Sequence, residues 1–144
     1  MKYILIFRLL PFVLILAACK GTAIPISTSE VLSQRISVAG GTYTDLSVAE
    51  LQTMLTNKDF TFINVHIPFE GNIAKTDLSI PYDQIDHNLA KLPSNKNEKV
   101  VLYCRSGRMS SIVAKYLVSQ GYTNIWNLSG GMVAWEQAGL PMER

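Results

Sequence analysis

One cysteine stands where an apolar run meets a polar, glycine-containing loop. Residues 100–103 (VVLY) are typical of a strand buried on both faces of a parallel sheet, and Cys104 follows them directly. Residues 105–109 (RSGRM) then lead into a helix predicted from Ser110 to Gln120. Such a loop turns its N–H groups inward and aims the positive end of the helix dipole at its contents. These features predict that Cys104 is a nucleophile, because they stabilise a thiolate.

A free cysteine on its own is more often a buried core residue. The residues after Cys104 favour catalysis instead. Gly107 permits the left-handed or crowded backbone that a tight loop needs, and Arg105 and Arg108 add positive charge beside the sulfur. Sites in open parallel sheets also form beyond the carboxyl ends of the strands, where Cys104 is expected to lie.

Two segments resemble one family. Residues 104–110 (CRSGRMS) are similar to the active-site loop of the rhodanese family, and residues 128–135 (LSGGMVAW) with 139–141 (GLP) are similar to its closing motif. The resemblance implies a sulfurtransferase that takes a sulfane sulfur from a donor such as thiosulfate as a persulfide on Cys104. A thiol, or cyanide in the assay, then accepts the sulfur. The resemblance also implies that one loop binds the substrate and the persulfide: Arg105, Ser106, Gly107, Arg108 and Met109.

The resemblance fails at one edge of the expected pocket. Family members commonly carry D-x-R after the second strand, where this chain has residues 64–66 (NVH). The family's G-H-I is replaced by residues 71–73 (GNI), and the spacing from Glu70 is shorter. The roles of Asn64 and Asn72 are therefore open, and we expect His66 at the pocket rim because it follows a strand end.

Two other functions fit parts of the pattern. Phosphatases and arsenate reductases of related folds use a Cys-x5-Arg loop, whose arginine clamps an oxyanion through two hydrogen bonds. That position is Ser110 here, and Arg108 comes too early, so this alternative is weak. A rhodanese-like binding or regulatory module is the second alternative, although such modules usually lose the cysteine.

Strand and helix patterns alternate from about residue 42 to the end of the chain. This alternation predicts an α/β domain, an open and mostly parallel sheet flanked by helices. Ser47 and Glu50 have the spacing of a capping box at the start of a helix. The expected strands cover 60–65, 100–103 and 124–128, and the expected helices begin after Ser47 and cover 83–92, 110–120 and 131–138.

The first eighteen residues predict export. A basic start, the apolar run 9–18 and the small residues before Cys19 fit a signal peptide at 1–18. Residues 16–19 (LAAC) resemble the lipobox of bacterial lipoproteins, which implies lipidation of Cys19; the alternative is a plain secretory signal. Residues 19–41 are predicted to be a flexible tether and 42–144 the rhodanese-like domain. We therefore expect a lipid-anchored protein of the cell envelope on a periplasm-facing membrane. In enterobacterial lipoproteins an aspartate directly after the lipidated cysteine is associated with retention in the inner membrane. This chain has Lys20 there, so the outer membrane is an open alternative.

Charge and cysteine count limit the partners. With Lys2 and Arg8 removed, the basic residues equal the 11 acidic ones, so no basic stripe is expected to bind nucleic acid. Cys19 and Cys104 are the two cysteines of the sequence, which excludes a C-x-x-C oxidoreductase. The histidines, His66 and His87, are far apart, so no metal site and no cofactor are expected. The expected partners are a small sulfur donor, a thiol or cyanide acceptor and the membrane through lipid, with a monomer as the default.

Overall fold

The computed structural model of the protein describes residues 33–144. The predicted signal peptide, Cys19 and most of the predicted tether lie outside the described residues. No helix within 33–144 is long and apolar enough to cross a membrane.

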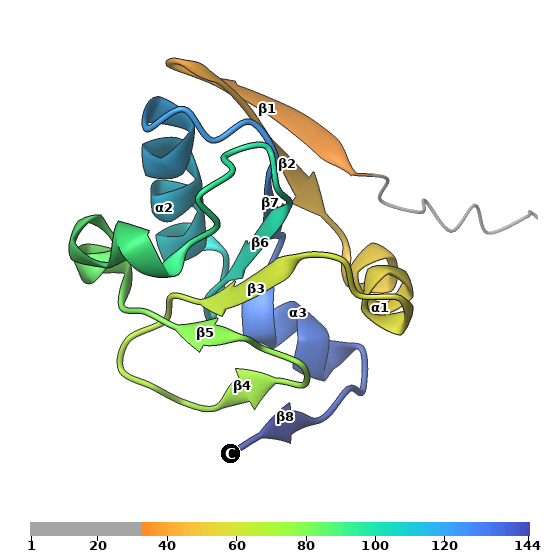
Figure 1. Ribbon diagram of the computed structural model, residues 1–144. Helices are drawn as coiled ribbons and strands as arrows, with labels where there is room; N and C mark the ends of the chain where they lie inside the picture. Colours follow the sequence, from red (N-terminus) through yellow and green to blue (C-terminus); the bar gives the residue numbers. More distant parts are fainter. Residues whose placement is uncertain (1–32) are drawn as a thin grey trace, which may run out of the picture.

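Strands and helices alternate along this part of the chain, as the sequence predicts (Figure 1). Two 3₁₀ helices, η1 and η2, lie between β5 and β6. The elements in chain order are β1 (Gln34–Val38), β2 (Gly41–Leu46), α1 (Val48–Thr56), β3 (Thr61–Asn64), β4 (Asn72–Ile73), β5 (Leu78–Ser79), η1 (Tyr82–Gln84), η2 (Asp86–Lys91), β6 (Val100–Tyr103), α2 (Arg108–Ser119), β7 (Ile125–Leu128), α3 (Gly131–Gln137) and β8 (Met142–Glu143).

Six of the strands form one sheet in the order β1-β2-β7-β6-β3-β5. All neighbours from β2 to β5 run parallel, and β1 pairs antiparallel with β2 at the edge. β4 and β8 form a separate antiparallel pair near the C-terminus. The predicted α/β class with a mostly parallel sheet is confirmed.

Helices cover both faces of this sheet (Figure 1). On one face, α2 and the 3₁₀ helices bury side chains such as Val113, Leu117 and Ile85. On the other face, α1 and α3 bury Leu51 and Trp135. All four residues of β6 are completely buried, which explains why its sequence is continuously apolar.

The predicted boundary between tether and domain is wrong. Residues 34–38 form strand β1, and the turn that follows reaches β2 through Gly40 and Gly41, both at positive φ. Ile36 and Val38 pack against the core while Arg35 and Ser37 are exposed, an alternation typical of an edge strand. The domain therefore begins before residue 42.

Smaller differences concern helix type and helix start. The helix expected at 83–92 is a pair of 3₁₀ helices, and α2 begins at Arg108 instead of Ser110. The predicted capping box of α1 is confirmed, because Ser47 N–H donates to Glu50 Oε2 at 2.8 Å and Glu50 N–H donates to Ser47 Oγ at 3.3 Å.

Candidate active site

Three loops meet at the carboxyl edge of the sheet, because β3, β6 and β7 are adjacent parallel strands. Cys104 follows β6, His66 and Glu70 follow β3, and Gly130 and Gly131 follow β7. The chain places β5 on one side of β3 and β6 on the other, so the strand order reverses here. Such a switch point is where open α/β sheets form their sites.

The Cys104 sulfur is enclosed by hydrogen-bond donors of its own loop. The residue is 1% exposed, and its Sγ accepts the Gly107 N–H at 3.1 Å. The hydroxyl of Ser110 lies 3.5 Å from the same sulfur and 3.2 Å from the Gly107 carbonyl oxygen, the two acceptors within reach of its one hydrogen. Gly107 has a φ of 91°, a left-handed conformation that lets the chain turn into α2 directly after this N–H. Both donors face the position that a negatively charged sulfur would occupy.

Helix α2 adds further donors to this loop. It begins at Arg108, and its N-cap residue Gly107 has no side chain to cap it. The first N–H groups of an α-helix lack acceptors within the helix, so those of Arg108, Met109 and Ser110 are available at the positive end of the helix dipole. An anionic group attached to Cys104 therefore finds a site of the kind that binds phosphates and other anions.

Hydrogen bonds from the start of α3 hold the backbone of Cys104 and Arg105. Met132 N–H donates to the carbonyl oxygen of Cys104 at 2.9 Å, and Val133 N–H donates to that of Arg105 at 3.0 Å. Gly131 lies directly against this backbone, since a Cβ there would be 2.1 Å from the Cys104 carbonyl oxygen. The two motifs quoted from the sequence are thus in direct contact.

The Glu70 carboxylate pairs with Arg105, the residue directly after Cys104; this exposed side of the Cys104 loop is called its mouth. Arg105 Nη1 donates to Glu70 Oε2, and the same oxygen lies 3.2 Å from His66 Nε2. The hydrogen bond from the Arg105 guanidinium holds the pKa of Glu70 below its usual range. The His66 side chain is 6% exposed, and its geometry toward Glu70 is not that of a hydrogen bond. Both ring nitrogens therefore lack a hydrogen-bond partner within residues 33–144.

Asn64 and Asn72, which depart from the resembled family, contact each other. Asn64 Nδ2 donates to Asn72 Oδ1 at 3.0 Å and to the Gly71 carbonyl oxygen at 2.9 Å. Asn64 Oδ1 accepts the His66 N–H at 2.9 Å. The Tyr103 hydroxyl also donates to Asn72 Oδ1, at 3.2 Å. These bonds form a neutral network beneath the loop after β3.

The predicted loop residues divide into two groups. Cys104 and the backbone of Gly107 face each other, whereas the side chains of Ser106 and Arg108 are exposed and that of Met109 packs against the core. His66 lies at the mouth beside Glu70. Sequence reasoning did not select Glu70 as a site residue, because its contact with Arg105 joins two distant parts of the chain.

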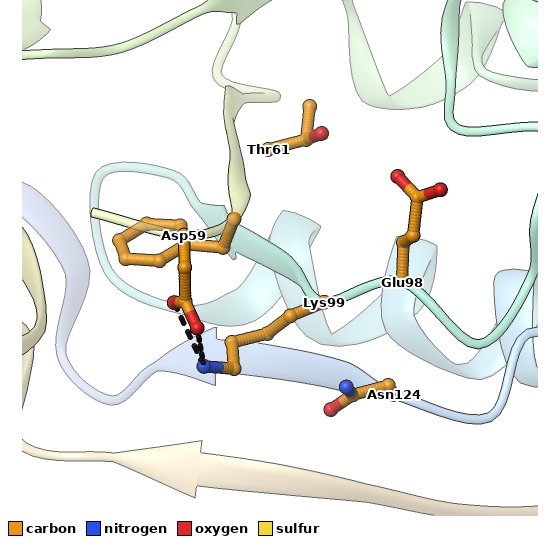
Figure 2. Close-up of a pocket in the computed structure, with 6 residues that line it drawn as sticks. Asp59, Thr61, Glu98, Lys99 and Asn124 are labelled. Atoms are coloured by element: carbon orange, nitrogen blue, oxygen red, sulfur yellow. Dashed lines mark hydrogen bonds and ion pairs between the residues drawn. The ribbon is translucent and has the colours of Figure 1, made fainter. Parts of the chain in front are cut away.

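A separate pocket of about 430 Å³ lies at the opposite edge of the sheet (Figure 2). It lies where β3, β6 and β7 begin, and Lys99 Nζ contacts both Asp59 oxygens in it, at 2.9 and 3.2 Å. None of the residues predicted for the site lines it. This pocket is therefore separate from the loop that holds Cys104.

The mostly parallel sheet and the loop that holds Cys104 are features of one family of proteins. Comparison with known sequences identifies this family. The model of the rhodanese-like domain matches residues 48–138. The chain belongs to the rhodanese-like family. A sulfurtransferase of Allochromatium vinosum is 33% identical over 93 residues, 63% of this chain and 85% of that protein. The solved structure of a rhodanese-like domain protein from Staphylococcus aureus is 33% identical, with a TM-score of 0.58, over 69% of this chain and 98% of that one.

More distant relatives differ in length and name. A tRNA uridine(34) hydroxylase of Escherichia coli is 27% identical over 107 residues, 67% of this chain but 31% of that protein. The chain thus spans most of the Allochromatium sulfurtransferase and about a third of the hydroxylase. The family relatives support sulfurtransferase-type activity in the broad sense.

Proposed function

We propose that the protein is a sulfurtransferase that carries a sulfane sulfur as a persulfide on Cys104. In the first half-reaction the thiolate attacks the outer sulfur of a donor such as thiosulfate. A Cys–S–S bond forms, the donor's S–S bond breaks, and its electron pair leaves with sulfite. In the second half-reaction a thiolate or cyanide takes the outer sulfur, and the Cys104 thiolate is regenerated. No outside oxidant, metal or cofactor is needed for this balance.

The observation that carries the proposal is the set of N–H donors at the Cys104 sulfur. Gly107 N–H reaches Cys104 Sγ at 3.1 Å, and the start of α2 supplies further N–H groups beside it. A persulfide anion extends one sulfur beyond the thiolate, and N–H groups that lack acceptors beside it would stabilise its charge. Ser110 occupies the position of the clamping arginine of phosphatases, which leaves persulfide chemistry as the better fit.

Mass spectrometry tests the covalent intermediate directly. Full-length protein, purified in detergent, is incubated with thiosulfate and measured intact and after proteolysis. We expect a gain of one sulfur on the peptide that contains Cys104, its loss on adding cyanide, and release of thiocyanate. Cys104→Ser is the control and should show neither the added sulfur nor turnover. Unmodified Cys104 with several sulfane donors would overturn the proposal.

One observation favours a second candidate, a rhodanese-like binding module. Cys104 is 1% exposed, so a donor reaches its sulfur only if the surrounding residues move to admit it. A module that binds without catalysis would keep this geometry and stay unmodified in the experiment above. The two candidates therefore predict opposite mass spectra.

We also propose that the protein is exported and anchored by lipid on Cys19. The support is the apolar run followed by residues 16–19 (LAAC). Metabolic labelling with an alkyne fatty acid should tag the protein, and Cys19→Ala should abolish the label. A tagged Cys19→Ala protein would contradict this site of lipidation.

A further inference from the structure

We propose that Glu70 is a specificity-determining residue that favours donors with a single negative charge, thiosulfonates and organic persulfides, over the thiosulfate dianion. The inference rests on the sulfurtransferase function proposed above. It concerns the charge at the mouth of the Cys104 loop, which the sequence alone suggests is strongly positive because two arginines follow the cysteine.

The contacts of Glu70 show that one of these arginines is neutralised. Arg105 and Glu70 form an ion pair at the mouth, with side chains 54% and 39% exposed. The same Glu70 oxygen lies 3.2 Å from Nε2 of His66, whose side chain is nearly buried. The pair therefore brings no net charge to an approaching donor.

The second arginine is left without such a partner. Among residues 33–144, no carboxylate lies within 4.0 Å of the Arg108 guanidinium, whereas Arg105 has Glu70. With Arg105 neutralised, the positive charge beside Cys104 is smaller, and the attraction that is lost is twice as large for a dianion as for a monoanion. Next to Glu70, the Phe69 side chain is 62% exposed and offers an apolar surface to an organic substituent.

The chemistry of a thiosulfonate donor is balanced in the same way as that of thiosulfate. The Cys104 thiolate attacks the outer sulfur of R–SO₂–S⁻ and forms the Cys–S–S⁻ persulfide. The S–S bond of the donor breaks, and its electron pair leaves with the sulfinate R–SO₂⁻. Thiosulfate and methanethiosulfonate thus deliver the same sulfur and differ mainly in charge.

The experiment compares these two donors in Glu70→Gln, which removes the charge and keeps the shape. In a double-displacement reaction kcat/KM for the donor reports the first half-reaction, so cyanide serves as a common acceptor. All assays are run at the same pH, so that both donors meet the protein in the same protonation state. Freeing the Arg105 charge acts twice as strongly on a dianion. The ratio of kcat/KM for thiosulfate to that for methanethiosulfonate should therefore rise about three- to tenfold.

Two further variants assign the effect. Glu98→Gln removes the same charge from the opposite edge of the sheet, where Glu98 lines the pocket of Figure 2, and should leave the ratio unchanged. Arg105→Gln should lower the ratio by about the factor by which Glu70→Gln raises it, because it leaves the Glu70 charge unpaired, and the double variant should return the ratio close to that of the wild type.

The outcomes separate this inference from the proposed function. A ratio in Glu70→Gln equal to that of the wild type overturns the inference, whether both rates fall together or stay constant. A shift of equal size in Glu98→Gln also overturns it, since any surface charge would then do the same. If the wild type forms no persulfide with either donor, the proposed function fails, and the inference fails with it.

Discussion

A Cβ atom on Gly131 would lie 2.1 Å from the carbonyl oxygen of Cys104. Real atoms do not approach so closely, so one of the two backbones would have to move. The next residue, Met132, donates its N–H to that same carbonyl at 2.9 Å. The backbone conformation of Cys104 therefore depends on a glycine in α3, a helix that carries none of the predicted catalytic residues.

Gly131→Ala should displace the Cys104 loop and lower kcat/KM for sulfur transfer by about a hundredfold, the cost of an ångström-scale misplacement. Gly139→Ala is the matched control. Gly139 also has a positive φ, +77° against +56° at Gly131, but nothing lies within 4 Å of its Cβ position. Both variants share the backbone strain of about 1–2 kcal/mol, and only one collides with the loop. Equal activities of the two variants, measured on folded protein, would contradict this role of Gly131.

Ser110→Ala tests the second donor at the sulfur. Ser110 is completely buried, and its Oγ lies 3.5 Å from Cys104 Sγ. Loss of one hydrogen bond should slow persulfide formation about two- to tenfold in a single-turnover measurement. Ser111→Ala is the control, because the Ser111 hydroxyl donates to the Arg108 carbonyl at 2.8 Å and not to the sulfur. A similar loss in Ser111→Ala would mean that the helix, and not the donor, determines the rate.

The parts of the fold that local signals specify were predictable. Strand β6 is four apolar residues between a polar turn and the cysteine, and both its type and its bounds agree with the sequence. The capping box before α1 is likewise a pattern within four residues. Edge strand β1 was missed, because serine and glycine next to it suggested a tether, although Ile36 and Val38 alternate with exposed residues.

The contacts that shape the site were harder to predict because they join distant residues. Glu70 meets Arg105 only after β3 and β6 have paired, and Gly131 meets Cys104 only after β7 has joined β6. The sequence indicates which residue types stand at each strand end. The strand order decides which of these residues contact each other, and a single sequence does not show the strand order.

The capping box of α1 should give a stability that depends on pH. Burial raises the pKa of Glu50, but the hydrogen bonds from Ser47 and Ser33 outweigh it and leave the pKa below its ordinary value. The unfolded chain therefore takes up the proton first, and the stabilisation by Glu50 is lost as the pH falls through its folded-state pKa. Glu50→Gln should lower the free energy of unfolding by about 1 kcal/mol at pH 7 and by much less at pH 3, measured by urea unfolding. A difference that stays constant between the two pH values would contradict the charged capping box.

Asn64→Asp should destabilise the loop after β3. The Asn64 side-chain amide donates to two acceptors, the Gly71 carbonyl oxygen at 2.9 Å and Asn72 Oδ1 at 3.0 Å. A carboxylate has no N–H to donate and would place negative charge against both oxygens in a buried site. Urea unfolding should show a loss of about 1–3 kcal/mol in the free energy of unfolding.

Adding Asn72→His to this variant should recover part of the loss, because a histidine N–H can donate to the new carboxylate. The two departures from the common family pattern would then be a compensating pair. Asn88→Asp is the control: it also removes a bond from a side-chain amide to a carbonyl, that of Gln84, but at the surface. Water replaces the bond there, so the loss should stay within about 0.5 kcal/mol. Additive effects of Asn64→Asp and Asn72→His in this cycle would show that the two positions are energetically independent despite their contact.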